Sequence, residues 1–320
     1  MTSNLNSIKA SQGYDAFWRF AFERQNIFYK RMNGQIVGLT EDPILQEFKF
    51  TNAYRASDRV SQYLIKNVIY SSEFSVEDTV FRILLFKLFN KIETWKLIEN
   101  EFGEISTETF KVGVYSLLLD KFMDKGIRVY SNAYMMASGA KEFPVKKKHH
   151  AHFLLLQKML QDNLPDKIQA CQSMEEGYKL LLSYPMIGQF LAYQYITDIN
   201  YSEVTNFSEC EFTVPGPGAK DGIRKCFVST GGYDDSDIIK MMTDQQEEEF
   251  LKRDLDFKYL GARKLQYIDI QNIFCETDKY CRVAHPDLLG YSGRTRIKQK
   301  FKPNETPINI FYPPKWKIRL

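Results

Sequence analysis

The chain has 320 residues and a formal net charge of only +3, from 43 basic and 40 acidic side chains. Its composition, 44% hydrophobic and 26% charged, excludes disorder over most of the length, and 5 Cys exclude a disulfide-dense protein. No apolar run reaches the roughly 18 residues of a membrane span, and the polar stretch from Met1 to Gln12 lacks a signal-peptide core. We therefore expect a cytoplasmic protein with no membrane partner.

The charge is unevenly distributed along the chain. Residues 294–320 hold eight basic residues and one acid, a sum of +7, so residues 1–293 sum to −4. Such an asymmetry of sign indicates a polyanionic partner. Alternate side chains of an extended segment lie on one side, and we expect the alternating cations of the tail to follow a DNA backbone. These are Arg294, Arg296, Lys298 and Lys300.

Hydrophobic spacing and capping residues predict a mainly helical chain. A helix around Phe17 is expected to end at Gly34, Asp42-Pro43 is a helix start, and Ser75 precedes a helix that runs through Phe89. Further helices are expected over residues 52–70, 107–125, 148–163, 166–182, 188–198, 235–254 and 265–283. The Gly/Pro-rich stretch 202–232 predicts a loop, with short strands at 211–214 and 226–228.

These elements predict three parts of the chain. A flexible N-terminus over residues 1–12 precedes a helical domain over 13–289, built either as one body or as two interleaved lobes. The tail over 290–320 has four prolines and no helical period, so we expect it to be extended.

A turn between two expected helices carries Pro185 and Gly188. This pattern is typical of a helix–hairpin–helix, in which the turn and the following helix N-terminus direct backbone N–H groups at a phosphate. An ordinary helix–helix connection has the same pattern. In helix–hairpin–helix DNA glycosylases an aspartate downstream of the hairpin faces the sugar of a flipped nucleotide and stabilises positive charge there. Asp198 is the candidate for that role, with Glu203, Glu209 and Glu211 as competitors.

A dense Gly/Pro/basic run follows, and its glycines and cations are candidates for a phosphate cradle. It is neither a Walker A loop nor a dinucleotide fingerprint. The candidate phosphate-binding residues here are Gly216, Gly218, Lys220, Arg224 and Lys225.

Polar and aromatic residues near the N-terminus are candidates for a base pocket, although salt bridging between helices explains such residues as well. The base-pocket candidates are Arg19, Arg24, Asn52, Tyr54, Arg55 and Asp58, together with Tyr201.

Three of the four histidines fall within Lys146–His152. No neighbouring acid or Cys completes a ligand set, so we expect a solvated basic loop near DNA and no metal. No cofactor is expected either.

Several of these motifs occur together in one family. They are Phe17-Trp18-Arg19-Phe20 with Glu23-Arg24; Asp42-Pro43; Phe50-Thr51-Asn52-Ala53-Tyr54-Arg55; Asp198 to Glu203; Pro215 to Ala219 with Gly222 to Lys225; and Gln271 to Glu276 with Lys279-Tyr280. From about Phe17 to Lys302 the chain resembles the α-glutamyl/putrescinyl thymine pyrophosphorylase family, also described through a 5-hydroxymethyluracil DNA kinase helical domain.

The resemblance implies a mainly α fold related to helix–hairpin–helix DNA glycosylases, and double-stranded DNA with modified pyrimidines as substrate. It implies an enzyme that replaces a pyrophosphate on modified thymine with an amine or amino acid, functionally coupled to a DNA base kinase. The alternatives are a glycosylase that excises hypermodified bases as a defence against phage, and a non-catalytic reader of modified DNA. A nucleotide kinase is disfavoured because ATP phosphates need a backbone cradle and a lysine.

Overall fold

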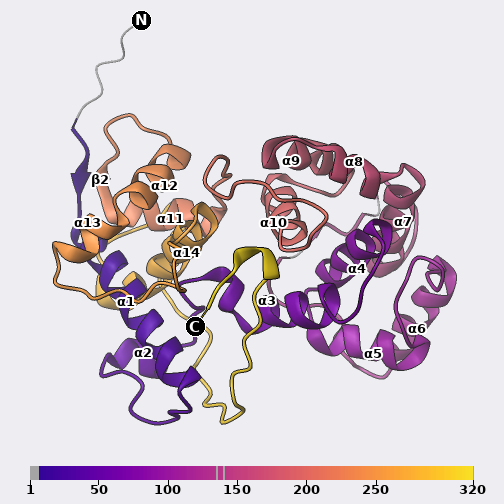
Figure 1. Cartoon of the computed structure of the whole chain (residues 1–320), viewed down its shortest axis with the longest axis horizontal. Coiled ribbons are helices and arrows are strands. Elements are labelled where there is room, and N and C mark those ends of the chain that lie inside the picture. The colour runs from indigo at the N-terminus through magenta and orange to yellow at the C-terminus, as the bar shows by residue number, and fades with distance from the viewer. Residues whose placement is uncertain (1–6, 135, 140, 320) are drawn as a thin grey trace, which may run out of the picture. The chain divides into compact units, whose positions relative to one another are not determined.

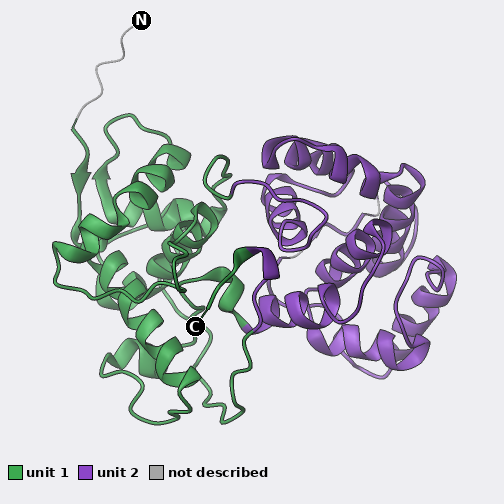
Figure 2. Cartoon of the chain, viewed as in Figure 1, with its two compact units in different colours: residues 1–58, 209–310, 316–320 green, residues 59–208, 311–315 purple. Residues whose placement is uncertain are grey.

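The structure, a computed structural model, describes residues 7–134, 136–139 and 141–319. The chain is mainly helical and divides into two compact units (Figures 1 and 2). Unit 1 comprises residues 1–58, 209–310 and 316–320, and unit 2 comprises residues 59–208 and 311–315. Within the described part of the chain, every helix is too short or too polar to cross a lipid bilayer.

Unit 1 combines the N-terminal helices with those that follow residue 209. Its helices are α1 (Gln12–Met32), α2 (Pro43–Glu47), α11 (Pro217–Cys226), α12 (Asp235–Asp244), α13 (Gln246–Leu251) and α14 (Tyr267–Ala284), with a 3-10 turn η1 (Arg55–Ser57). Strand β1 (Lys9–Ala10) pairs antiparallel with β2 (Phe227–Ser229), with Lys9 opposite Ser229. Helices α1, α11 and α14 contact one another and form the core of this unit (Figure 1).

Aromatic rings and small residues fill this three-helix core. Phe17 of α1 lies 4.6 Å from Phe274 of α14 between ring centroids, and Trp18 lies 5.0 Å from Phe250. Glycines allow the backbones to approach. A Cβ on Gly13 would lie 2.5 Å from the carbonyl oxygen of Lys225, so α1 and α11 are in direct backbone contact.

The predicted loop over residues 202–232 is wrong in its second half, where α11 is a regular helix. Pro217 occupies its first turn, where proline costs no hydrogen bond. Gly222 is required by packing, because a Cβ there would lie 2.0 Å from the carbonyl oxygen of Phe274. The glycines that indicated a loop therefore serve close helix packing. The predicted strand at 211–214 is also wrong, and the strand predicted at 226–228 is found as β2.

All regular elements among the described residues of unit 2 are helices or helical turns. It contains α3 (Arg59–Tyr63), a π-helical turn η2 (Leu64–Ile69), α4 (Val76–Phe89), α5 (Ile92–Phe102), α6 (Val112–Asp124), α7 (Lys148–Gln161), α8 (Leu164–Ala170), α9 (Met174–Leu182) and α10 (Gln189–Ile199). Helix α4 is buried along its length from Thr79 to Phe89 and contacts α5, α7, α8, α10 and η2, so it is the core of the unit.

Helix starts were predicted well, and some long helices were not. Asp42 and Ser75 both cap helices with their side chains, as expected. The helix expected over 52–70 is instead η1, α3 and η2 in succession, and the one expected over 166–182 is split into α8 and α9. The helix expected over 235–254 is likewise split into α12 and α13.

The histidine-rich segment is not a solvated loop, which corrects that prediction. It forms the first turns of α7, and His149 and His152 are fully buried. In the tail, Lys300 forms an isolated antiparallel bridge with Phe48, and a 3-10 turn, η3, spans Pro314–Trp316. The described tail has no regular strand, so strand geometry does not align its cations on one side.

Gly222→Ala should lower the free energy of unfolding by about 1–3 kcal/mol, because the added methyl group collides with backbone that cannot move independently. Urea unfolding followed by circular dichroism measures the change. Gly113→Ala is the matched control: Gly113 is exposed near the start of α6 and a Cβ there would meet nothing within 4 Å. The control should gain up to about 1 kcal/mol from helix propensity. Equal stability of the two variants would contradict the packing role.

Candidate functional site

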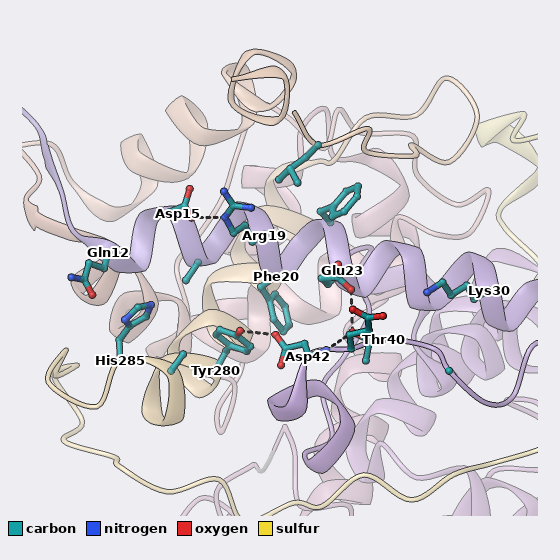
Figure 3. A pocket seen from close by; sticks show the side chains of 16 residues that line it. Gln12, Asp15, Arg19, Phe20, Glu23, Lys30, Thr40, Asp42, Tyr280 and His285 are labelled. Atoms are coloured by element: carbon teal, nitrogen blue, oxygen red, sulfur yellow. Dashed lines mark hydrogen bonds and ion pairs between the residues drawn. The ribbon is translucent and has the colours of Figure 1, made fainter. Parts of the chain in front are cut away.

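A cavity of about 820 Å³ lies in unit 1 beside α1 and the end of α14 (Figure 3). The volume of this cavity is within the range of small-molecule sites, roughly 300–1,000 Å³. Among the base-pocket candidates, Arg19 lines the cavity. The cavity is lined by Gln12, Asp15, Ala16, Arg19, Phe20, Phe22, Glu23, Lys30, Gly38, Thr40, Glu41, Asp42, Leu255, Tyr280, Ala284 and His285.

Helical spacing brings the α1 side chains together on the cavity wall. Residues 12, 15, 16, 19, 20 and 23 recur at intervals of three and four and therefore share one face of the helix. The segment before α2 supplies the facing side. There the Tyr280 hydroxyl donates a hydrogen bond to Oδ2 of Asp42 at 2.6 Å, and the Thr40 hydroxyl donates to Glu23 at 3.1 Å (Figure 3).

The cavity combines polar walls with aromatic rings. Partial burial acts to raise the pKa of Asp15, but hydrogen bonds from Arg19 and Arg253 outweigh it and hold this pKa below its usual value. Burial and the Asp42 carboxylate raise the pKa of Tyr280, which therefore remains a hydrogen-bond donor. The rings of Phe20 and Tyr280 lie 5.7 Å apart. Donors, acceptors and apolar faces together suit a planar polar ring such as a base.

Three of the other base-pocket candidates form a polar network in unit 1. Arg24 donates to Oδ1 of Asn52 and to the carbonyl of Thr51, each at 2.9 Å. The backbone N–H of Asn52 donates to Asp58 at 2.8 Å. Burial raises the pKa of Asp58 to about 7. Because their polar groups bond to one another, these residues hold segment 51–58 in place.

Tyr54 and Arg55 are buried and join the same segment to α14 and to the residues that precede this helix. The Tyr54 hydroxyl donates to the carbonyl of Arg263 at 2.6 Å, and the backbone N–H of Arg55 donates to Asp269 at 2.8 Å. Asp269 also completes the capping box of α14. Both candidates therefore have structural contacts in this unit.

Of the candidate phosphate-binding residues on and before α11, two are exposed. Lys220 and Arg224 lie four residues apart on the helix surface, and Arg224 lines a second cavity of about 270 Å³. Lys225 is buried in an ion pair with Asp278 at 3.0 Å. The backbone N–H of Gly216 donates to Gln271 at 3.2 Å, and Gly218 packs against Cys275.

The predicted hairpin in unit 2 is a turn between α9 and α10. Pro185 is half-buried, and Gly188 is the exposed N-cap residue of α10. Gly188 has an ordinary φ of −86°, whereas Met186 takes the left-handed value of +67°. Glycine at 188 is therefore not required by backbone strain, and its open surroundings leave room for another group.

Asp198, the first catalytic candidate, is completely buried in unit 2. Its Oδ2 lies 3.1 Å from Nζ of Lys87, which also donates to Asn90 at 2.8 Å. The Lys87 ammonium lies 4.1 Å from the ring centroid of Tyr134, a residue with a positive φ of 56°. The geometry thus gives Asp198 a charge partner in the interior.

The other candidates differ in exposure. Glu203 and Glu211 are exposed, and Glu203 accepts a hydrogen bond from the Tyr70 hydroxyl at 2.9 Å. Tyr201 is buried, and its carbonyl accepts from the same hydroxyl. In the tail, Arg294, Arg296, Lys298 and Lys300 are all exposed, and Lys300 pairs with Glu47.

Sequence reasoning missed most of the residues around the larger cavity. Asp15, Glu23, Thr40, Asp42 and Tyr280 were not chosen as site residues. A signal was present, because Asp42 and Tyr280 belong to motifs that carry the family resemblance. Their approach across more than 230 residues was not visible in the sequence.

The family model for the 5-hmdU DNA kinase helical domain matches residues 11–290. This chain belongs to that family. A 5-hmdU DNA kinase of Bacillus phage SP10 is 27% identical over 319 residues, which cover 93% of this chain and 49% of that protein. The chain therefore spans about half the length of this curated relative. No solved structure matches the chain.

In this family member, Asp198→Asn should lower the free energy of unfolding by about 3 kcal/mol, because it leaves the Lys87 ammonium buried without its charge partner. Chemical denaturation provides the measurement. The control is Asp162→Asn, which breaks a surface pair with Lys158 and should leave the free energy of unfolding almost unchanged. Unchanged stability with lost activity would instead identify Asp198 as catalytic.

Proposed function

We propose that this chain is a DNA base-modification enzyme that acts on a flipped, 5-hydroxymethyl-derived pyrimidine in double-stranded DNA. The observation that carries the proposal is membership of the 5-hmdU DNA kinase helical domain family over residues 11–290. The phage relative, whose printed name is 5-hmdU DNA kinase, supports a modified uracil as the substrate class. A base must leave the stack before its 5-substituent can enter a cavity, at a cost of a few kcal/mol.

The reaction we favour replaces pyrophosphate on the 5-methylene carbon with an amine or amino acid. The amine nitrogen forms a bond to that carbon, the carbon–oxygen bond breaks, and pyrophosphate leaves with the electron pair. Cations must neutralise this leaving group, and Arg19, Lys220 and Arg224 are exposed or line a cavity. A carboxylate must accept the amine proton, and Glu203 and Glu211 are exposed candidates.

A second candidate function is a part in the phosphorylation of 5-hmdU, which the name of the relative favours. The sequence contains no G-x-x-x-x-G-K-[ST] loop. In that reaction the chain would supply recognition of the base, and another polypeptide segment would supply the groups that bind ATP.

Duplexes that contain thymine, 5-hydroxymethyluracil or its pyrophosphate ester test the proposal. We expect pyrophosphate release and an amine-substituted nucleoside, detected by mass spectrometry, from the ester duplex with a diamine or amino acid present. Phosphate transfer from ATP to 5-hydroxymethyluracil would support the second function. Alkali-labile breaks in the DNA would overturn both proposed functions in favour of a glycosylase. No turnover of any duplex would overturn the proposal that the chain is an enzyme.

Arg19→Ala should reduce kcat/KM in this assay at least about tenfold, because removal of a single charged group from a transition state costs this much. Arg128→Ala is the matched control, since Arg128 is an exposed arginine in unit 2 outside the cavity. The exposed ion pair of Arg19 with Asp15 contributes little to stability. Equal activity of the two variants would show that the larger cavity is not the reaction site.

The exposed tail cations should contribute to DNA affinity through counterion release. Replacing Arg294, Arg296, Lys298 and Lys300 with alanine should flatten the slope of log K against log salt by up to about 3–4. Fluorescence anisotropy with a labelled duplex measures this slope. The control replaces Lys96, Lys111, Lys121 and Lys125, four exposed lysines of unit 2, with alanine. The same slope in both variants would show that the tail does not contact DNA.

A further inference from the structure

Two histidines at the start of α7 face one carboxylate of α6 within unit 2. Nε2 of His149 lies 2.8 Å from Oδ1 of Asp120, and Nε2 of His150 lies 3.2 Å from Oδ1 and 3.1 Å from Oδ2. One ligand atom from each residue lies within 4.8 Å of the other two. No metal was expected here, because no acid adjoins the histidines in the sequence. Folding brings Asp120 to them from 29 residues away.

These distances suit a shared metal ion. Zinc binds imidazole nitrogen and carboxylate oxygen at about 2.0–2.2 Å, so neighbouring ligand atoms of a tetrahedral site lie roughly 3.3 Å apart. The two separations between Asp120 and the histidines, 2.8 and 3.2 Å, are close to that value, and one ligand nitrogen of each histidine lies within 4.8 Å of the other. Two imidazoles and one carboxylate are also a donor set that divalent transition metals prefer.

The cluster can be reached from solvent on one side. His149 is buried, whereas Asp120 and His150 are partly exposed, which leaves access for an ion and for a water ligand.

We propose that Asp120, His149 and His150 bind a divalent transition-metal ion of the Zn²⁺ class, with the fourth position open to water. The ion joins the end of α6 to the start of α7. This site is independent of the DNA-modifying reaction proposed for the chain.

Lys147 is the competitor for the same carboxylate. Its Nζ lies 3.0 Å from Oδ1 of Asp120 and 3.4 Å from Oδ1 of Asp124. The side chain is 39% exposed and can move to Asp124 when an ion enters. A purely structural cluster is this same arrangement with the lysine and the histidines as the partners of Asp120. If the cluster is a metal site, removing the lysine should strengthen metal binding. If it is purely structural, removing the lysine should produce no metal binding.

Titration of the full-length, tag-free, chelator-treated chain with Co²⁺ alone tests the site, because tetrahedral or five-coordinate Co²⁺ with nitrogen ligands absorbs visibly. We expect one equivalent to bind and Zn²⁺ to displace it. His150→Ala and Asp120→Asn should each weaken binding at least about tenfold, since even loss of an outer-shell partner costs 10–100-fold. Lys147→Met should strengthen binding several-fold.

Asp162→Asn is the matched control, because it removes a carboxylate at the other end of α7 that pairs with Lys158 and takes no part in the contacts of Asp120, Lys147 or the two histidines. It should bind Co²⁺ as tightly as the unmodified chain. Circular dichroism checks that each variant is folded. If Asp120→Asn unfolds, His150→Ala still tests the site, because His150 is partly exposed. No saturable Co²⁺ spectrum in the unmodified chain, or equal affinity in His150→Ala, overturns the proposal. Weaker binding by Lys147→Met also overturns the assigned geometry.

Discussion

The close approach of α11 to α14 is the constraint on which unit 1 depends. Gly222 permits it, because any Cβ there would collide with the carbonyl of Phe274. The buried pair of Lys225 with Asp278 joins the same two helices. The far turn of α14 then carries Tyr280 to Asp42, so the shape of the larger cavity follows from the packing of α14 against α1 and α11.

Folding divides the charged residues into two groups with different uses. Lys87, Asp198, Lys225 and Asp278 are paired in the interior, where an ion pair adds little stability but a single partner left alone is costly. Lys220, Arg224 and the tail cations remain at the surface. A polyanion can reach only this second group. The net charge of the sequence thus says less about DNA binding than the list of cations that folding leaves exposed.

Local signals were predictive where local contacts decide the structure. Asp42 and Ser75 bond to backbone N–H groups two or three residues away, so their helix starts could be predicted from the sequence. The glycines before and within α11 were misread as loop signals, because their partners lie on α14 some 50 residues later. The helix expected over 52–70 failed because contacts of Tyr54 and Arg55 with Arg263 and Asp269 hold that segment in another conformation.

The sequence by itself determined the helical class, the main helix starts, the turn between α9 and α10, the charge asymmetry and the motifs of the family. Only the tertiary structure decided which cations are buried, which side chains line the cavity, and that Asp120 meets His149 and His150. Capping and helical periodicity depend on neighbours within about four residues, so they are readable along the chain. A cavity or a ligand set depends on segments separated by tens to hundreds of residues, and their approach is fixed by packing.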